Sequence, residues 1–314
     1  MYDTTKPYKK EILELVKQTW ETPYISVRDW LVKEKSPYRN YEKVHHPDGI
    51  GTKGIYHWIQ RSFRNAVIDG MNANRNDLAL KRAVPYALID HLFFPKDDHS
   101  AVLDTMGYLV EECKKENIAI TGGETAIHDN MEGLEIGIIM LGFVKKPKSN
   151  RFRVGDILIG IGSSGLHSNG FTKVREVFGE EYRPDFILPT YNYLDTVLAL
   201  NEELDIHGMM HITGGAFTKL KDVLRDDTDV MITNKHELDP KDIFFELHER
   251  GVSNEEMYKT FNCGIGFVLG VSKEDSSRCL DKIKDFKADV IGKVKQGSGR
   301  VLIESQFDNR IVEC

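Results

Sequence analysis

Residues 155–171 read Gly-Asp-Ile-Leu-Ile-Gly-Ile-Gly-Ser-Ser-Gly-Leu-His-Ser-Asn-Gly-Phe, and this stretch indicates the fold class. The apolar run over 156–161 predicts a buried strand, and the glycine and serine residues after it predict a loop. A helix is expected over 171–178. A strand, a polar glycine loop and a helix in this order favour a protein of mixed helices and strands whose loop faces a small ligand.

Helices and strands alternate along the rest of the chain as well. Helices are expected over 11–20, 64–83, 193–203, 217–224 and 239–249, with a further one that begins at an N-cap Ser100. Strands are expected over 118–121, 136–144, 230–233 and 264–271. The class is therefore α/β or mixed α+β. Lys145-Lys-Pro-Lys-Ser-Asn150 interrupts the apolar pattern and predicts a linker between two domains, 1–146 and 150–314.

The composition is that of an ordinary globular enzyme. The 314 residues include 42 Lys and Arg against 49 Asp and Glu, a net charge of −7. Nucleic acid as a partner requires a basic face, so we expect none, whereas a bound cation lets an acidic protein hold a small phosphorylated ligand. No apolar run approaches the about 20 residues of a membrane span, and the N-terminus lacks an apolar signal core. The four cysteines form no Cys-x-x-Cys pair, so we expect a cytoplasmic protein without a membrane partner.

The glycine loop also matches the dinucleotide pattern G-x-G-x-x-G over 160–165. This pattern needs a helix directly after the loop and an acidic residue about 20 positions further on, at the end of the next strand. Here the helix begins only after Gly170, and Glu180-Glu181 lie in a polar stretch. A polar loop that faces a small ligand is therefore the favoured interpretation, and a dinucleotide site is the alternative.

Asp48-Gly-Ile-Gly-Thr-Lys53 has the composition of a phosphate loop. Glycines let backbone N–H groups approach an anion, and Lys53 supplies a point charge for a phosphate. Asp48 suits this place only if a cation lies between it and the phosphate, which points to Mg²⁺ with its preference for oxygen ligands. A plain turn is an equally good interpretation of the segment alone.

Two further segments carry carboxylates in unusual places. Asn76-Asp77 lies in the expected helix over 64–83, which is very polar for a helix that packs on a sheet; a solvated helix face is the alternative. Gly122-Gly-Glu-Thr125 follows the expected strand over 118–121, and a carboxylate on a short loop at a strand end suits a metal or ligand contact. A tight turn explains the second segment equally well.

Taken together, six ordered segments resemble the aminoimidazole ribonucleotide synthetase family, the cyclo-ligases of the PurM-like ATP-binding superfamily. Residues 155–171 resemble the family's own loop nearly position by position. His211-Ile-Thr-Gly-Gly-Ala-Phe217 is similar to its His-Ile-Thr-Gly-Gly-Gly motif, and 256–267 is similar to its Met-x-x-x-Phe-Asn-Met-Gly-Ile-Gly run. The first-half segments similar to Asp-Gly-Val-Gly-Thr-Lys, Asn-Asp-Leu and Gly-Gly-Glu-Thr-Ala are Asp48–Lys53, Asn76–Leu78 and Gly122–Ala126.

The resemblance implies a two-domain PurM-like fold. It would be a homodimer whose N-terminal domains share a β-barrel, with a C-terminal α/β domain, and it would use ATP, Mg²⁺ and a ribotide substrate. The candidate metal ligands by motif are Asp48, Asp77 and Glu124. The candidate nucleotide contacts of the first domain are Gly49, Gly51, Thr52, Lys53, Asn76, Gly123 and Thr125. The loop residues that would line the nucleotide and ribotide cleft are Ser168, Asn169, Thr213, Gly214 and Gly215.

The implied reaction is the ATP-dependent cyclisation of formylglycinamidine ribonucleotide to aminoimidazole ribonucleotide in purine biosynthesis, through an iminophosphate. Such chemistry requires in-line positioning, and cations that meet the charge on the transferring phosphoryl oxygens. A histidine in the cleft would move the proton of ring closure, and His211 is favoured over His167 for this role. A structural, hydrogen-bonded histidine is at least as good an interpretation of each.

Two segments depart from the family's pattern. The family's Gly-Ala-Glu-Pro reads Arg82-Ala-Val-Pro85, which lacks the carboxylate, and its Glu-Met-Pro-Gly reads Ile127-His-Asp-Asn130. The alternatives are a paralogue that uses ATP on another small molecule, a non-catalytic nucleotide-binding paralogue, and a nicotinamide-dependent oxidoreductase. Three aromatic residues among the first forty positions either cover the cleft as part of a lid or, more commonly, pack in a core: Trp20, Tyr24 and Trp30.

Overall fold

The computed structural model describes residues 8–314, and these form two compact units. The first unit contains the described residues through Lys146 together with Tyr182–Pro189. The second contains Pro147–Glu181 and Thr190–Cys314. Within residues 8–314, no helix has both the length and the apolar character to cross a membrane. The first seven residues, part of the N-terminus from which we expected no signal segment, lie outside the described range.

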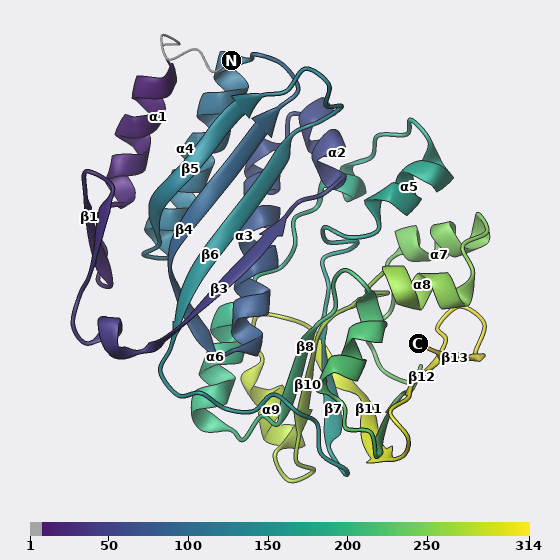
Figure 1. Ribbon diagram of the computed structural model, residues 1–314. Coiled ribbons are helices and arrows are strands. Elements are labelled where there is room, and N and C mark those ends of the chain that lie inside the picture. Colours follow the sequence, from purple (N-terminus) through teal and green to yellow (C-terminus); the bar gives the residue numbers. More distant parts are fainter. Residues whose placement is uncertain (1–7) are drawn as a thin grey trace. The chain divides into compact units, whose positions relative to one another are not determined.

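A four-stranded sheet forms the centre of the first unit (Figure 1). In sheet order its strands are β3 (Glu42–Gly49), β6 (Glu135–Val144), β4 (Ala83–Phe94) and β5 (Ala119–Ile127). The β4–β5 pair is parallel, whereas β6 runs antiparallel to both β3 and β4. β5 continues through Gly122–Thr125, so the loop expected there is wrong. The cause is pairing: parallel ladder contacts with β4 extend as far as Ile127 and override the turn preference of the two glycines.

Helices cover one face of this sheet. α3 (Phe63–Leu80) and α4 (His99–Lys115) pack on the strands, and α1 (Tyr8–Val16) packs on α4. Apolar side chains of α4 such as Leu109 are fully buried in the core between the helices and the sheet. Ser100 is not the N-cap of α4: Asp98 caps it instead, because its carboxylate accepts a hydrogen bond from the Ala101 N–H at 3.1 Å.

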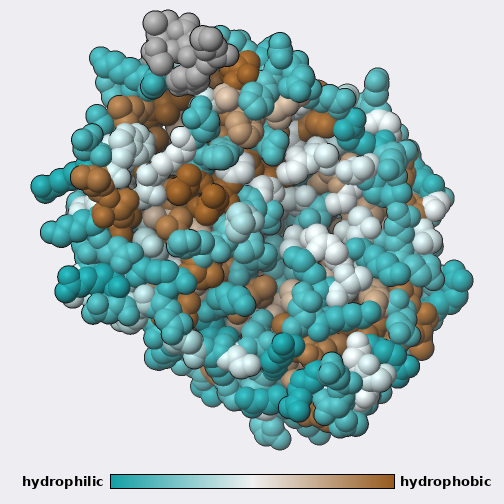
Figure 2. Space-filling model, in the orientation of Figure 1, coloured by the Kyte–Doolittle hydropathy of each residue, from teal (hydrophilic) through white to brown (hydrophobic). Residues whose placement is uncertain are grey.

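The opposite face of the sheet is open within this unit, because no described helix of the unit packs on it. The hairpin of β1 (Ile25–Arg28) and β2 (Leu31–Glu34) covers only one end, where Ile25 joins an aromatic cluster around Phe143. Figure 2 views this face, and hydrophobic residues gather over the strands between hydrophilic ones. On β6, Ile139 is 38% exposed.

A short helix and single-turn helices complete the first unit. They are α2 (Lys53–Ile59), η1 (Lys17–Thr19), η2 (Tyr38–Asn40) and η3 (Pro184–Ile187). η3 belongs to this unit although it lies far along the chain: Phe186 stacks edge-on against Tyr56 of α2, with ring centroids 5.1 Å apart.

A seven-stranded sheet organises the second unit. In sheet order its strands are β13 (Ile311–Glu313), β12 (Val301–Glu304), β9 (Thr228–Ile232), β11 (Ala288–Gln296), β7 (Ile157–Gly162), β10 (Ile265–Val271) and β8 (Gly208–His211). β7, which precedes the glycine loop, runs antiparallel to both of its neighbours. A dinucleotide-binding fold requires a parallel sheet at this point, so the alternative based on G-x-G-x-x-G is wrong.

The helices expected in the second unit lie close to their predicted positions, as α5 (Phe171–Phe178), α6 (Leu194–Glu203), η4 (Ala216–Val223) and α7 (Asp242–Glu249). Two further helices were not predicted, α8 (Asn254–Thr260) and α9 (Ser276–Lys282). α5 has the predicted bounds. The α-helix expected over 217–224 is a 3₁₀ helix, η4, entered through Gly215 in the left-handed conformation at φ +81°.

Candidate active site

Two of the three candidate metal ligands lie near one point of the first unit. Asp48 is near the end of β3 and Asp77 is on α3, and His46 of β3 lies close to both. The Nε2 atom of His46 is 3.1 Å from a carboxylate oxygen of Asp77, and its Nδ1 atom is 3.1 Å from Oδ1 of Asn74. The hydrogen bond to Asp77 raises the pKa of His46, and the charges of Asp77 and Asp48 add to this effect. This point therefore favours a positive charge.

Glu124, the third candidate ligand, lies elsewhere. One cross-strand row contains Asp48, Ile138, Asp90 and Gly123, and the next contains Gly49, Gly137, His91 and Glu124. Because successive residues of a strand point to opposite faces, Glu124 projects from the open face and Asp48 from the helix-covered face. Three strand spacings of about 4.8 Å also separate β3 from β5, so one Mg²⁺ with bonds of about 2.1 Å does not join Asp48 to Glu124 within one subunit.

Lys53, the expected phosphate contact, is fully buried at the start of α2. Its ammonium lies 2.7 Å from Asp69 and donates a hydrogen bond to the Leu188 carbonyl at 2.6 Å. His57 contacts the same Asp69 oxygen at 2.9 Å. Burial alone would raise the pKa of Asp69, but Lys53 and His57 hold it below its usual range. In this structure Lys53 therefore joins α2 to α3 and to the 182–189 segment and does not face an open phosphate site.

The other candidate nucleotide contacts near β3 differ in exposure. Gly51 and Thr52 are exposed in the turn between β3 and α2, and Gly51 has a φ of +52° that favours glycine. Gly49 is half-buried at the end of β3, where Asp48 Oδ1 accepts a hydrogen bond from its N–H at 2.7 Å. Asn76 is fully buried in α3. The exposed turn is thus the part of the predicted loop that is open to a ligand.

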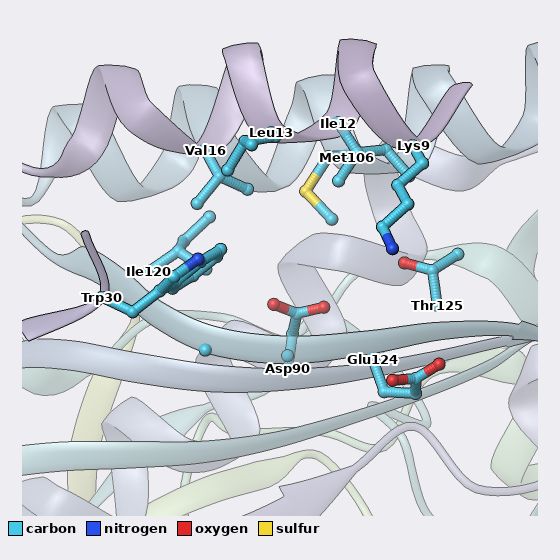
Figure 3. A pocket seen from close by; sticks show the side chains of 12 residues that line it. Lys9, Ile12, Leu13, Val16, Trp30, Asp90, Met106, Ile120, Glu124 and Thr125 are labelled. Carbon is cyan, nitrogen blue, oxygen red and sulfur yellow. The ribbon is translucent and has the colours of Figure 1, made fainter. Parts of the chain in front are cut away.

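Gly123, Glu124 and Thr125 line a cavity of about 360 Å³ on the helix side of the sheet (Figure 3). α1 forms its roof, the sheet forms its floor, and Met106 of α4 closes one wall. Trp30 from the β1–β2 turn also lines it, and the Trp30 ring packs edge-on against Trp20, with ring centroids 5.1 Å apart. Of the three aromatic residues considered for a lid, Trp30 thus borders a cavity. The indole of Trp20 donates a hydrogen bond to the Ile120 carbonyl in the core, and Tyr24 packs on Phe143.

Asp90 lies at the floor of this cavity, and the sequence analysis did not single it out. Its residue is only 2% exposed, and burial raises the pKa of its carboxyl to about 7, with a contribution from Glu124. A signal for it exists in the sequence. Asp90 interrupts the apolar strand β4 at the same parity as Leu88 and Leu92, both of which are core residues.

The two candidate catalytic histidines lie in the second unit, with ring centroids 6.4 Å apart. His167 is 1% exposed and His211 is 2% exposed. Both rings pack beside Tyr193, and His211 stacks on Phe267 of the neighbouring strand β10. His167 accepts a hydrogen bond from the Ser164 N–H at 3.3 Å. Such packing is typical of histidines with a structural role, which is the alternative to a catalytic role for both residues.

The loops that follow β7 and β8 meet within the second unit. The amide of Asn169 donates a short hydrogen bond to Thr213, and Ser168 shares a hydrogen bond with Thr190 at 2.9 Å. A Cβ atom on Gly214 would lie 3.2 Å from Oδ1 of Asn169, so the glycine allows the close approach. Gly215 turns the chain into η4. The structure therefore brings together the five loop residues that the motifs connected.

No group of three His, Cys, Asp or Glu side chains in the described range is placed to hold a metal ion alone. Asp48 and Asp77 nevertheless fit Mg²⁺, which commonly takes one or two protein carboxylates and completes its shell with phosphate and water. His46 lies in hydrogen-bond contact with Asp77, so it is a neighbour of any cation bound at this point.

Comparison with known protein families covers most of the chain. Residues 38–144 match "AIR synthase related protein, N-terminal domain", and residues 153–304 match "AIR synthase related protein, C-terminal domain". The phosphoribosylformylglycinamidine cyclo-ligase of Saccharolobus solfataricus is 35% identical, with 81% of this chain and 79% of the relative covered. That of Methanococcus vannielii is 33% identical, with 88% and 83% covered.

A solved structure shows the same fold at lower sequence similarity. Hydrogenase maturation protein HypE in complex with ATP superposes with a TM-score of 0.70 at 15% identity, over 99% of this chain and 95% of that chain. At this identity the likeness concerns the fold alone; together with the two matched domains it agrees with the two-domain PurM-like fold expected from the motifs. The two matched domains and the identity to cyclo-ligases show that this chain belongs to the AIR synthase related family.

Proposed function

We propose that this protein catalyses the ATP-dependent cyclisation of formylglycinamidine ribonucleotide to aminoimidazole ribonucleotide, a C–N bond-forming step of purine biosynthesis. The observation that carries the proposal is the identity of 33–35% to phosphoribosylformylglycinamidine cyclo-ligases over most of the chain. The ordered motifs of both units support it, since each lies on a defined turn, strand or helix end in the structure.

The chemistry requires activation of a poor leaving group. The formyl oxygen of the substrate attacks the γ-phosphorus of ATP and ADP leaves, which gives an iminophosphate. The amidine nitrogen then attacks the formyl carbon, which closes the ring. The bond between this carbon and the former formyl oxygen breaks, phosphate leaves with that oxygen, and the nitrogen loses a proton. Both steps depend on positioning and on charge stabilisation, which oxygen-ligated Mg²⁺ supplies when it is bound.

In our proposal Asp48 and Asp77 hold Mg²⁺, and the exposed turn at Gly51 and Thr52 meets the phosphates. Glu124 serves a separate point on the open face. We also propose that four further residues contact the nucleotide: Gly49, Asn76, Gly123 and Thr125. Lys53 acts by positioning, because it ties α2 to Asp69.

For the second unit, we propose that the two meeting loops bind ligand. Those loops carry Ser168, Asn169, Thr213, Gly214 and Gly215. A role of His211 or His167 in the ring-closure proton transfer requires the aromatic packing around their rings to open.

We also propose a homodimer that forms through the open face of the first unit's sheet, with strands of two subunits in one barrel. The exposed Ile139 and the half-buried Ile89, Leu141 and Phe93 give this face an apolar character that a partner sheet would cover. The four cysteines are free and buried. Free thiols are typical of a reducing compartment, which supports the proposed cytoplasmic location.

Turnover of the purified protein with ATP, Mg²⁺ and formylglycinamidine ribonucleotide tests the proposal. We expect release of phosphate that requires both substrates and formation of the aminoimidazole product. Asp77→Asn should lower kcat at least a hundredfold and raise the Mg²⁺ concentration needed for half-maximal rate, since the amide is a weaker cation ligand. Asp104→Asn, on the exposed side of α4, is the matched control and should leave both unchanged. Wild-type turnover in Asp77→Asn would remove Asp77 from the metal site.

A further inference from the structure

The cavity beneath α1 has the features of a ligand site. Its walls are mainly apolar and come from α1, α4, β5 and Trp30, and its floor contains the single buried carboxylate of Asp90. Figure 3 shows the Asp90 carboxylate pointing from the sheet into the cavity, toward α1. Small-molecule sites combine apolar walls with a few placed polar groups in this way.

Within residues 8–314, no side chain donates a hydrogen bond to the Asp90 carboxylate, which accepts one from its own backbone N–H. A buried charged or polar group without a side-chain partner is costly to keep. The neighbouring strand β5 leaves space for this carboxylate. A Cβ atom on Gly123 would lie 2.3 Å from Oδ1 of Asp90, so only glycine fits at position 123. The structure thus holds an acceptor open toward the cavity.

The rest of the cavity limits what the acceptor can bind. Trp30 and Met106 offer flat or adaptable apolar surfaces to a planar group. Figure 3 shows Asp90 at the middle of the floor, with Trp30 on one side and the Lys9 ammonium beside Thr125 on the other. A ligand that suits Asp90 and Lys9 together carries N–H donors on a planar cation and a separate negative group.

We propose that this cavity binds an amidine, with its two N–H groups paired to the carboxylate of Asp90. A carboxylate and an amidinium are planar and form two parallel charge-assisted hydrogen bonds. The identification of this amidine with that of the ribotide substrate rests on the proposed function. Asp90 is then the residue that recognises the amidine, and Lys9 lies on the side of the substrate's phosphate.

Benzamidine is a suitable probe, because it presents an amidine on a flat apolar ring and needs no ATP or turnover. Its binding to the whole protein is measured by calorimetry, beside benzamide and benzoate. We expect binding of benzamidine but not of benzoate, and at least tenfold weaker binding of benzamidine to Asp90→Asn. Trp30→Ala, at a 46% exposed position, should also weaken it. Asp104→Asn is the control and should bind like the wild type.

A second arm separates this inference from the proposed function. In turnover assays, Asp90→Asn should raise the KM for the ribotide at least tenfold and leave the KM for ATP unchanged. Benzamidine binding that needs Asp90, in a protein without cyclo-ligase turnover, would overturn the function and keep the amidine site. Normal turnover with equal benzamidine binding or equal ribotide KM in wild type and Asp90→Asn would overturn the amidine site and keep the function.

Discussion

At the residue scale, the site is dominated by carboxylates in three different environments. Asp77 lies 3.1 Å from His46, Asp69 is buried with Lys53 and His57, and Asp90 is buried with no ion pair to a basic side chain of residues 8–314. Lys53 and His57 therefore lower the pKa of Asp69, whereas burial raises the pKa of Asp90. Environment, and not residue type, sets what each carboxylate can do.

The burial of Asp90 predicts a pH-dependent stability. Its pKa is raised from 3.8 to about 7, so between these values the folded protein holds a proton that the unfolded chain has lost. Stability contributed by this group is present below pH 3.8 and is lost as the pH rises toward 7. The charges of Glu124 on β5 and Cys113 on α4 interact with it, and Lys9 on α1 lines the same cavity.

Asp90→Asn removes this titration. Relative to the wild type, the variant should gain on the order of 2–4 kcal/mol of unfolding free energy between pH 4 and pH 8. Urea unfolding followed by tryptophan fluorescence measures it, because all three tryptophans, Trp20, Trp30 and Trp58, lie in the first unit. A difference between the two proteins that does not change with pH would contradict the assignment.

At the element scale, buried polar contacts fix how the helices of the first unit join. Lys53 and His57 of α2 both reach Asp69 of α3, and Lys53 also reaches the 182–189 segment, which comes from a distant part of the sequence. The predicted phosphate loop is thereby held at the junction of β3 with α2. The elements that carry the motifs are therefore positioned by contacts of residues that lie outside the motifs.

Asp69→Asn should destabilise the first unit strongly, since it leaves the buried Lys53 ammonium without its counter-charge. Loss of one partner of a buried ion pair costs about 3–5 kcal/mol. Tryptophan fluorescence in urea again gives the unfolding free energy. The double variant Lys53→Met with Asp69→Asn is the control and should recover part of the loss. A single variant within about 1 kcal/mol of the wild type would show that the pair does not hold α2 to α3.

The elements also show what the sequence could predict. The bounds of α5 follow from local signals, a glycine loop before it and apolar spacing within it. Gly122–Thr125 was expected as a loop because glycine preferences are local, whereas the strand there forms through pairing with β4, which is distant in sequence. Asp48 and Asp77 were connected by motif and lie together, but the separation of Glu124 depends on the strand order.

At the scale of the whole molecule, each unit has its own sheet, and the first sheet keeps one face open. An apolar open face of this kind is typical of an interface between subunits. The family membership accounts for the order of the motifs, and the open face suggests how two copies assemble.

Sedimentation tests the assembly. The chain has a mass of 35.9 kDa, and we expect the wild type to show twice this mass in sedimentation equilibrium. We expect Ile139→Asp to show the mass of a single chain, because a charge on the apolar face opposes the pairing of two subunits. Val154→Asp, at a 52% exposed position in the second unit, is the matched control and should stay dimeric. A wild type that sediments as one chain at micromolar concentration would contradict the shared barrel.

The central claim is that ATP activates the formyl oxygen for ring closure, and isotope transfer tests it most directly. Formylglycinamidine ribonucleotide labelled with ¹⁸O at the formyl group is converted with ATP and Mg²⁺, and the released phosphate is analysed by mass spectrometry. The account predicts one ¹⁸O atom in each phosphate, released in equal amount with aminoimidazole ribonucleotide. Unlabelled phosphate, or ATP hydrolysis without the aminoimidazole product, would contradict it.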